Sequence, residues 1–170
     1  MSERILVIVP TYNEMENLPR KAPLILEQDE RIEILVVDDA SPDGTGQLAD
    51  EMAAAAPRVH VLHRKSKDGL GQAYLAGFKW ALEHDFEVIF EMDADISHPP
   101  DALPRLIEAI GTHDFVIGSR YVEGRVTVSN WPMSRLLVSY FGSWYARMIT
   151  RMPVRDATGG FNGWHRRVLE

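Results

Sequence analysis

The chain has 170 residues, of which 45% are hydrophobic and 25% charged, as is usual for one globular domain. It contains no cysteine, which excludes structural disulfides, zinc–thiolate sites and thiol nucleophiles. The first residues lack the apolar core of a signal peptide, and no stretch approaches the ~18 apolar residues that cross a bilayer. These features are compatible with a cytoplasmic protein, and we expect any work at a membrane to be done from outside the bilayer.

The net charge of −7 is unevenly distributed along the chain. Residues 1–119 hold 10 basic and 22 acidic side chains, whereas residues 120–170 hold 8 arginines and 3 acidic side chains. An acidic body is therefore followed by a basic end. Such an end predicts contact with anions, although a solvated face explains the charge alone equally well.

Apolar runs of strand length alternate with segments of helical length. The predicted strands are Ile5–Val9, Ile32–Val37, Val59–Leu62, Phe86–Met92 and Phe115–Ile117. The predicted helices are about Glu16–Gln28, Thr45–Ala56, Gly71–His84 and Pro100–Ile110. Continuous apolar runs indicate strands that are buried on both faces. The pattern predicts an α/β domain with a mostly parallel sheet and helices on both faces.

Charged residues follow four of the predicted strands. Three of the loops carry acids, and the fourth, after Phe115–Ile117, carries Arg120. In open α/β sheets, ligands bind beyond the carboxyl ends of the strands. We therefore expect these four loops to form one site at one edge of the sheet.

The loop after the fourth strand reads Asp93-Ala94-Asp95. In an extended segment the two carboxylates share a side, where they repel each other unless a proton or a cation intervenes. Mg²⁺ or Mn²⁺ suits such oxygen ligands, often together with substrate phosphates. Ser97 either adds a ligand or caps the helix that begins near Pro99. The sequence predicts a divalent metal site here, with the cap preferred for Ser97.

The loop after the second strand begins with Asp38 and Asp39, which are consecutive and should face opposite ways. One is expected to point toward the cleft while the other fixes the loop. The Ser41–Gly44 stretch that follows is typical of a turn.

Two other patterns carry less information. The stretch from Lys65 to Gly71 resembles a phosphate loop, but it fits neither glycine-rich motif, because Tyr74 stands where G-x-G-x-x-G needs its third glycine. We interpret it as a flexible loop that enters a helix. The six histidines show no convincing metal-binding spacing.

A segment rich in aromatic residues and arginine runs from Trp131 to about Arg151, with Arg135 and Arg147 inside it. No acidic residue occurs from Val126 to Arg155. An amphipathic helix of this composition suits a membrane interface, but a core-packed helix with exposed arginines explains it as well. Nucleic acid is a poorer partner, because the body is acidic and no recognised reader motif is present.

Taken together, the loops resemble the family 2 glycosyltransferases of GT-A fold, in particular the dolichol- or polyprenol-phosphate mannose synthase type. The similarity spans nearly the whole chain. The motifs that carry it, in the family's order, are P-T-Y-N-E from Pro10, V-V-D-D with S-P-D-G-T from Val36, G-L-G from Gly69, D-A-D with S-H-P-P from Asp93, G-S-R-Y from Gly118 and D-A-T-G-G-F from Asp156.

The resemblance implies a metal-dependent enzyme that transfers a sugar with inversion, chiefly mannose from GDP-mannose, to a polyprenyl or dolichyl phosphate. It implies that the nucleotide sugar is bound by Pro10, Tyr12, Glu14, Val37, Asp39, Asp93, Ala94, Asp95 and Arg120. Mg²⁺ or Mn²⁺ would be held chiefly by Asp95, with Asp93 and Ser97. Arg120 and Arg135 would contact the acceptor phosphate, and Asp93, Asp95 and Arg120 would carry the catalysis. The protein would then be peripheral at the cytoplasmic face of a membrane.

Three features depart from the family pattern. Family members usually continue past this point, so we expect a single catalytic domain over 1–170 that is truncated at its C-terminus. Its nucleotide-sugar and metal half is 1–119, and its acceptor-facing half, 120–170, is incomplete. Gly124-Arg125 and Phe161–Trp164 also differ from the usual residues, and both changes lie on the acceptor side.

Three other hypotheses stand beside this one. The first is a glycosyltransferase of the same family that uses a UDP-sugar. The second is a non-catalytic domain that binds nucleotide sugars or membranes. The third is a phosphohydrolase, because Asp93–Ser97 loosely resembles a D-x-D-x-T nucleophile motif; that motif normally follows the first strand, whereas here it follows the fourth.

Overall fold

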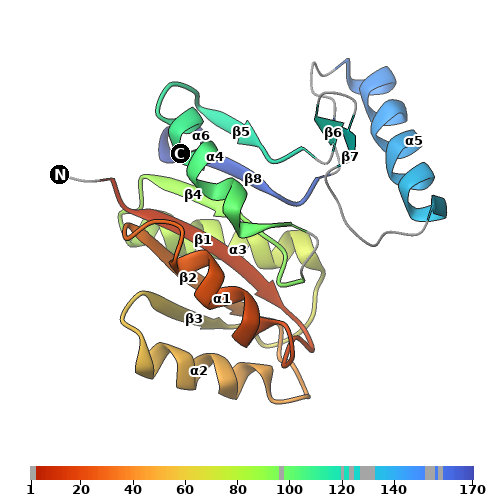
Figure 1. Cartoon of the computed structure of the whole chain (residues 1–170). Coiled ribbons are helices and arrows are strands. Elements are labelled where there is room, and N and C mark those ends of the chain that lie inside the picture. The colour runs from red at the N-terminus through yellow and green to blue at the C-terminus, as the bar shows by residue number, and fades with distance from the viewer. Residues whose placement is uncertain are drawn as a thin grey trace.

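The computed structural model describes residues 3–95, 98–119, 121–122, 125–126, 133–151, 156 and 159–170. A six-stranded sheet of order β3-β2-β1-β4-β8-β5 forms the centre of the fold (Figure 1). Its strands are β1 (Ile5–Thr11), β2 (Ile32–Asp38), β3 (Val59–His63), β4 (Val88–Glu91), β5 (Phe115–Ile117) and β8 (Asn162–His165). β1 to β4 pair in parallel with one another, which confirms the predicted mostly parallel sheet.

The helices lie where the sequence predicts them, with small shifts at their ends. They are α1 (Leu18–Leu26), α2 (Thr45–Ala55), α3 (Leu70–Glu83) and α4 (Leu103–Ile110), the last preceded by the 3₁₀ turn η1 (Pro100–Ala102). One core cluster joins α1, α2 and α4 to one face of the sheet, and a second joins α3 to the other face. Figure 1 shows α3 behind the sheet, with α1 and α4 in front of it.

The central strands are buried because they are apolar on both faces. In β1 the side chains of Ile5, Val7 and Val9 pack on the face of α1, while Leu6 and Ile8 pack on the face of α3. All five are at most 1% exposed. The continuous apolar pattern in the sequence follows directly from this double burial.

Strand β8 was not predicted. It lies antiparallel between β4 and β5. Its sequence, Asn-Gly-Trp-His, has only a weak strand pattern. A Cβ at Gly163 would stand 2.3 Å from the ring of Phe90, so only glycine allows this close packing. Residues 162–165 therefore join the sheet between two strands from earlier in the sequence.

The remaining elements are a short hairpin of β6 (Tyr121–Val122) and β7 (Arg125–Val126), helix α5 (Met133–Thr150) and the short helix α6 (Arg166–Leu169). Helix α5 is drawn away from the sheet (Figure 1). Within the described part of the chain, no helix is both long and apolar enough to span a membrane.

Candidate nucleotide-sugar and metal site

A pocket of about 270 Å³ opens at the carboxyl ends of β1, β2 and β4. Seven of the residues singled out in the sequence line it: Pro10, Tyr12, Glu14, Asp39, Asp93, Ala94 and Asp95. The other lining residues are Thr11, Lys67, Leu70 and Ala73. The pocket thus lies at the predicted edge of the sheet, where three of the four loops meet.

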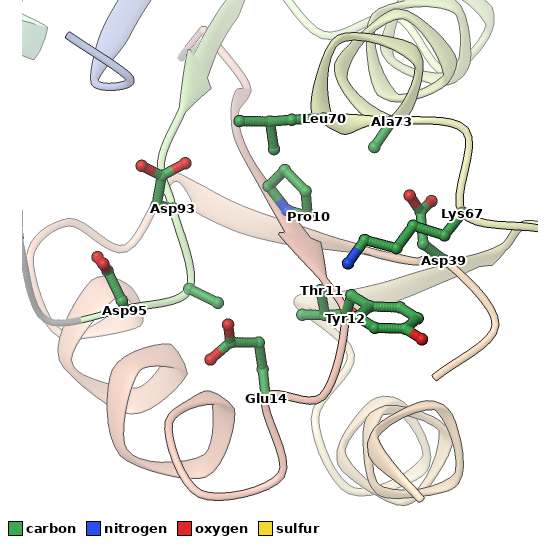
Figure 2. A pocket seen from close by; sticks show the side chains of 11 residues that line it. Pro10, Thr11, Tyr12, Glu14, Asp39, Lys67, Leu70, Ala73, Asp93 and Asp95 are labelled. Carbon is green, nitrogen blue, oxygen red and sulfur yellow. The ribbon is translucent and has the colours of Figure 1, made fainter. Parts of the chain in front are cut away.

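The pocket has two chemically different ends (Figure 2). Asp93, Asp95 and Glu14 lie at one end, while Tyr12 and the side chains around it form the other. Four carboxylates face a single lysine among the lining residues. Such an excess of negative charge favours a cation, and a polyanionic ligand would enter it together with one.

Backbone donors tie the loop after β1 to the loop after β2. The N–H of Asn13 donates to Oγ of Ser41 at 3.1 Å, and the N–H of Glu14 donates to Oγ1 of Thr45 at 2.9 Å. Thr45 is fully buried and donates its hydroxyl to Oδ1 of Asp43 at 2.6 Å. The S-P-D-G-T turn therefore fixes the position of the P-T-Y-N-E loop as well as its own.

Asp38 and Asp39 have different partners, as their consecutive positions predict. Oδ1 of Asp38 accepts hydrogen bonds from the hydroxyls of Ser41 at 2.5 Å and Thr11 at 3.2 Å. Asp39 lines the pocket, and its Oδ1 lies 2.5 Å from Nη1 of Arg64. Asp38 thus fixes the loop, whereas Asp39 presents a charge-paired carboxylate to the ligand side.

At the far end of the pocket, Tyr12 lies beneath the side chain of Lys67. The ammonium nitrogen is 3.6 Å from the centre of the Tyr12 ring, which is a cation–π distance. Lys67 belongs to the loop that precedes α3, the segment interpreted from the sequence as a flexible loop entering a helix. This loop therefore reaches the pocket, although it is no phosphate-binding motif.

The carboxylate of Asp93 is held by neighbours from two elements. Its Oδ1 accepts a hydrogen bond of 3.0 Å from the hydroxyl of Tyr74, and its Oδ2 lies 4.0 Å from Nε2 of His98. Burial raises the pKa of Asp93. The hydrogen bond from Tyr74 and the charge of His98 act to lower this pKa, but burial is the larger effect. The ionised form is therefore costly here until a cation compensates for it.

Lys21 supplies a positive charge that sequence reasoning missed. It lies on α1, is 3% exposed, and donates from Nζ to the backbone oxygens of Asp95 at 2.5 Å and His98 at 2.7 Å. Burial lowers the pKa of Lys21, while Asp95 and Asp93 act to raise it. The sequence contained an indication of this buried lysine, because the helical spacing of Leu18, Ala22 and Ile25 places Lys21 on the apolar face of α1.

The donor set suits a divalent ion that shares its coordination with a ligand. Asp93 and Asp95 offer two carboxylates, and Mg²⁺ or Mn²⁺ is commonly held by one or two carboxylates plus phosphate oxygens. Over the described ranges, no group of three or more His, Asp or Glu side chains is placed to hold a metal alone. These residues therefore fit a metal bound jointly with a diphosphate.

Four residues that were predicted for the site are not among the residues that line the pocket. Val37 is fully buried on the α3 face of the sheet, so its side chain does not line the pocket. Ser97 and Arg120 lie outside the described residues. Arg135 belongs to α5, but its side chain is also outside the described part.

The sequence matches the family model described as Glycosyl transferase family 2 over residues 6–170. An undecaprenyl-phosphate mannosyltransferase from Micrococcus luteus is 52% identical over 98% of this chain and 68% of its own length. A polyprenol monophosphomannose synthase from Mycolicibacterium smegmatis is 52% identical over 99% of this chain and 64% of its own. A dolichol-phosphate mannosyltransferase from Pyrococcus furiosus is 41% identical, and this chain covers 47% of it. The chain thus spans between about half and two thirds of these relatives.

Solved structures are similar over 98% of the chain. A glucosyl-3-phosphoglycerate synthase from Mycobacterium tuberculosis has a TM-score of 0.69 at 19% identity and is covered over 58% of its length. A mannosyltransferase from Pyrobaculum calidifontis, solved with GDP-Man and Mn²⁺, has a TM-score of 0.62 at 24% identity and is covered over 45%. At these identities the likeness concerns the fold, and it confirms the GT-A architecture. Since the family model matches nearly the whole sequence and two relatives share half of its residues, the chain belongs to glycosyl transferase family 2.

Proposed function

We propose that this chain transfers mannose from GDP-mannose to a polyprenyl phosphate, with Mg²⁺ or Mn²⁺ bound at Asp93 and Asp95. The observation that carries the proposal is the acidic pocket at the ends of β1, β2 and β4, in which the D-A-D segment faces the P-T-Y-N-E loop. Relatives that are 52% identical bear the names of an undecaprenyl-phosphate mannosyltransferase and a polyprenol monophosphomannose synthase. Both names support the lipid phosphate as acceptor.

The two ends of the pocket are proposed to bind different parts of the donor. The nucleoside is proposed to lie at the end formed by Tyr12, Asp39 and Lys67, where Lys67 covers one face of the Tyr12 ring and the carboxylate of Asp39 lines the pocket. The diphosphate lies toward Asp93 and Asp95. When bound, the divalent ion screens the diphosphate and stabilises the charge of the departing GDP.

The transfer needs no strong general base. A phosphate monoester is mostly doubly ionised at neutral pH, because its second pKa is about 6. An oxygen of the acceptor phosphate forms the bond to the anomeric carbon, while the bond from that carbon to the β-phosphate oxygen of GDP breaks and GDP keeps the electron pair. The protein's task is to hold donor and acceptor in line, to which Arg120 and Arg135 are proposed to contribute.

Helix α5 is proposed to bring the enzyme to the membrane surface where the lipid phosphate is found. Val138, Phe141, Tyr145 and Met148 follow helical spacing along one side, and each is more than half exposed. An exposed apolar face next to arginines in the sequence is typical of interfacial helices. This favours the membrane interpretation over the core-packed one.

Donor titration tests the proposal against its alternatives. GDP-mannose and UDP-glucose are each titrated into the protein by calorimetry, with and without Mn²⁺. We expect binding of GDP-mannose that is strengthened by Mn²⁺ and weaker binding of UDP-glucose. Preference for UDP-glucose would favour the UDP-sugar alternative. Binding without release of GDP on addition of polyprenyl phosphate would favour the non-catalytic one.

The phosphohydrolase hypothesis receives no support. The D-A-D segment follows β4, an inner strand, rather than the first strand of the sheet. The chain also matches a glycosyl transferase family over residues 6–170.

A further inference from the structure

We propose that Tyr74 and Lys21 are positioning residues that hold the D-A-D segment from opposite faces of the sheet. This inference rests on the proposed function, because it concerns the same metal site. It assigns a role to two buried side chains that do not themselves line the pocket.

Tyr74 acts on the carboxylate of Asp93. It lies on α3, is 7% exposed, and donates its hydroxyl to Oδ1 at 3.0 Å. A tyrosine hydroxyl carries its proton at neutral pH and therefore acts as the donor in this hydrogen bond. With Oδ1 engaged in this way, the rotation of the carboxylate is restricted, and Oδ2, which lies 4.0 Å from Nε2 of His98, keeps lone pairs for a further partner.

Lys21 acts on the backbone on the other side of the segment. Its ammonium bridges the carbonyl oxygens of Asp95 and His98, which stand three residues apart. Both carbonyls are drawn toward α1, on the face opposite α3. Because the bridge holds the main chain on the C-terminal side of Asp95, it restricts the position of the backbone from which the second carboxylate projects.

The burial of Lys21 is offset by its two hydrogen bonds to backbone oxygens. An ammonium group is costly to bury, and the positions around it on α1 are apolar, namely Leu18, Ala22 and Ile25. A methionine at this position would avoid that cost but would remove the donor to the carbonyl oxygens of Asp95 and His98. A role in fixing the backbone beside Asp95 explains why a lysine is placed here.

Three variants test the proposal. Tyr74→Phe removes one hydroxyl and keeps the ring, and Lys21→Met removes the ammonium and keeps most of the stem. Lys79→Met is the matched control, since Lys79 lies on α3 with its side chain 80% exposed. GDP affinity is measured with and without saturating Mn²⁺, together with the thermal unfolding midpoint of the metal-free proteins.

For Tyr74→Phe, we expect GDP affinity with Mn²⁺ to fall about 10-fold, as for loss of a hydrogen bond to a charged group. The affinity without metal should stay at the wild-type value. A purely structural lesion would instead lower both affinities together. Lys21→Met should show the same selective loss, and Lys79→Met should show none.

The outcomes separate this inference from the proposed function. If the wild type itself shows no Mn²⁺-dependent binding of GDP, the proposed function fails. If the wild type shows it and Tyr74→Phe binds equally well with Mn²⁺, the positioning role of Tyr74 is refuted. Should Lys21→Met fail to fold, Tyr74→Phe still decides the question for the α3 side, and Lys21→Arg tests whether a second donor restores the bridge.

Discussion

Gly160, in the segment just before β8, lies directly against the carboxylate of Asp93. A Cβ at Gly160 would stand 2.9 Å from Oδ2 and 3.3 Å from Oδ1. The next element, β8, pairs with β4. The segment that leads into β8 thus lies next to the pocket residue Asp93 as well as next to the sheet.

The first prediction concerns this contact. Gly160→Ala forces the Asp93 carboxylate to move and disturbs its hydrogen bond with Tyr74, because the contact is tighter than real Cβ atoms tolerate. We expect Mn²⁺-dependent GDP binding to weaken about 10-fold. Gly142→Ala, on α5 with nothing within 4 Å of the added Cβ, is the control and should bind as the wild type does. Equal binding by both variants would show that Asp93 needs no fixed position.

The second prediction concerns the pair formed by Arg64 and Asp39. Their side chains are 14% and 7% exposed, so removing the arginine leaves a largely buried carboxylate without its cation. We expect Arg64→Met to lower the free energy of unfolding by about 2–4 kcal/mol in urea titrations. Arg105→Met, an exposed arginine on α4, should change it little.

A double variant checks the cause of this loss. In Arg64→Met/Asp39→Asn the unpaired charge is gone, so most of the lost stability should return. If the double variant is as unstable as Arg64→Met alone, the loss comes from packing of the arginine stem rather than from the buried charge.

The third prediction concerns Asp93 and pH. Its pKa is raised by burial, so its stabilising contribution is present in acid and is lost as the pH rises through the raised value. At neutral pH the ionised group therefore lowers the stability of the metal-free protein. We expect Asp93→Asn to raise the unfolding midpoint at pH 7 and to abolish stabilisation by Mn²⁺ with GDP.

The same shift predicts the pH profile of binding. As the pH falls, the Mn²⁺-dependent affinity for GDP should begin to drop at a higher pH than the ordinary aspartate pKa of about 4, because protonation of Asp93 competes with the metal. Glu108→Gln, an exposed site on α4, is the control for both measurements and should leave them unchanged. A lower midpoint for Asp93→Asn at pH 7 would contradict the assigned cost of the buried charge.

The fourth prediction concerns the exposed face of α5. Phe141, Tyr145 and Met148 are each more than half exposed, and their replacement by serine removes apolar surface without unpacking the core. We expect the triple variant to lose sedimentation with vesicles that contain anionic lipid, while donor binding persists. Leu75→Ser removes a leucine that is 60% exposed on α3 and should sediment as the wild type does. If the wild type stays in the supernatant, α5 is no membrane-binding surface.

Much of the fold and part of the site could be predicted from local patterns. The strands β1, β2 and β4 are continuous apolar runs, and each is followed at once by the polar residues that meet in the pocket. Because parallel strands align their carboxyl ends, Asp39 and Asp93 could be placed together although 54 positions separate them in the sequence. For the placement of these two residues, the periodicity of the sequence and the topology of a parallel sheet were sufficient.

The remaining features depend on contacts that no local pattern contains. Strand β8 is held by β4 and β5, whose sequences lie about 45 to 75 residues earlier, and its own residues favour a strand only weakly. Tyr74 was noted only as the residue that breaks a glycine motif, whereas its hydroxyl holds Asp93. Lys21 could have been found as a cation on an apolar helix face, but its two carbonyl partners become visible only in the structure.

The most direct test of the account is the metal dependence of GDP-mannose binding in the wild type and in Asp95→Ala. Calorimetric titrations are made with Mn²⁺ and with EDTA, and Asp101→Ala, an exposed aspartate in η1, serves as the control. We predict that Mn²⁺ strengthens binding to the wild type and to Asp101→Ala, and that this gain disappears in Asp95→Ala. Binding that is the same with Mn²⁺ and with EDTA in the wild type, or a full gain from Mn²⁺ in Asp95→Ala, would contradict the assignment of the D-A-D segment as a metal and diphosphate site.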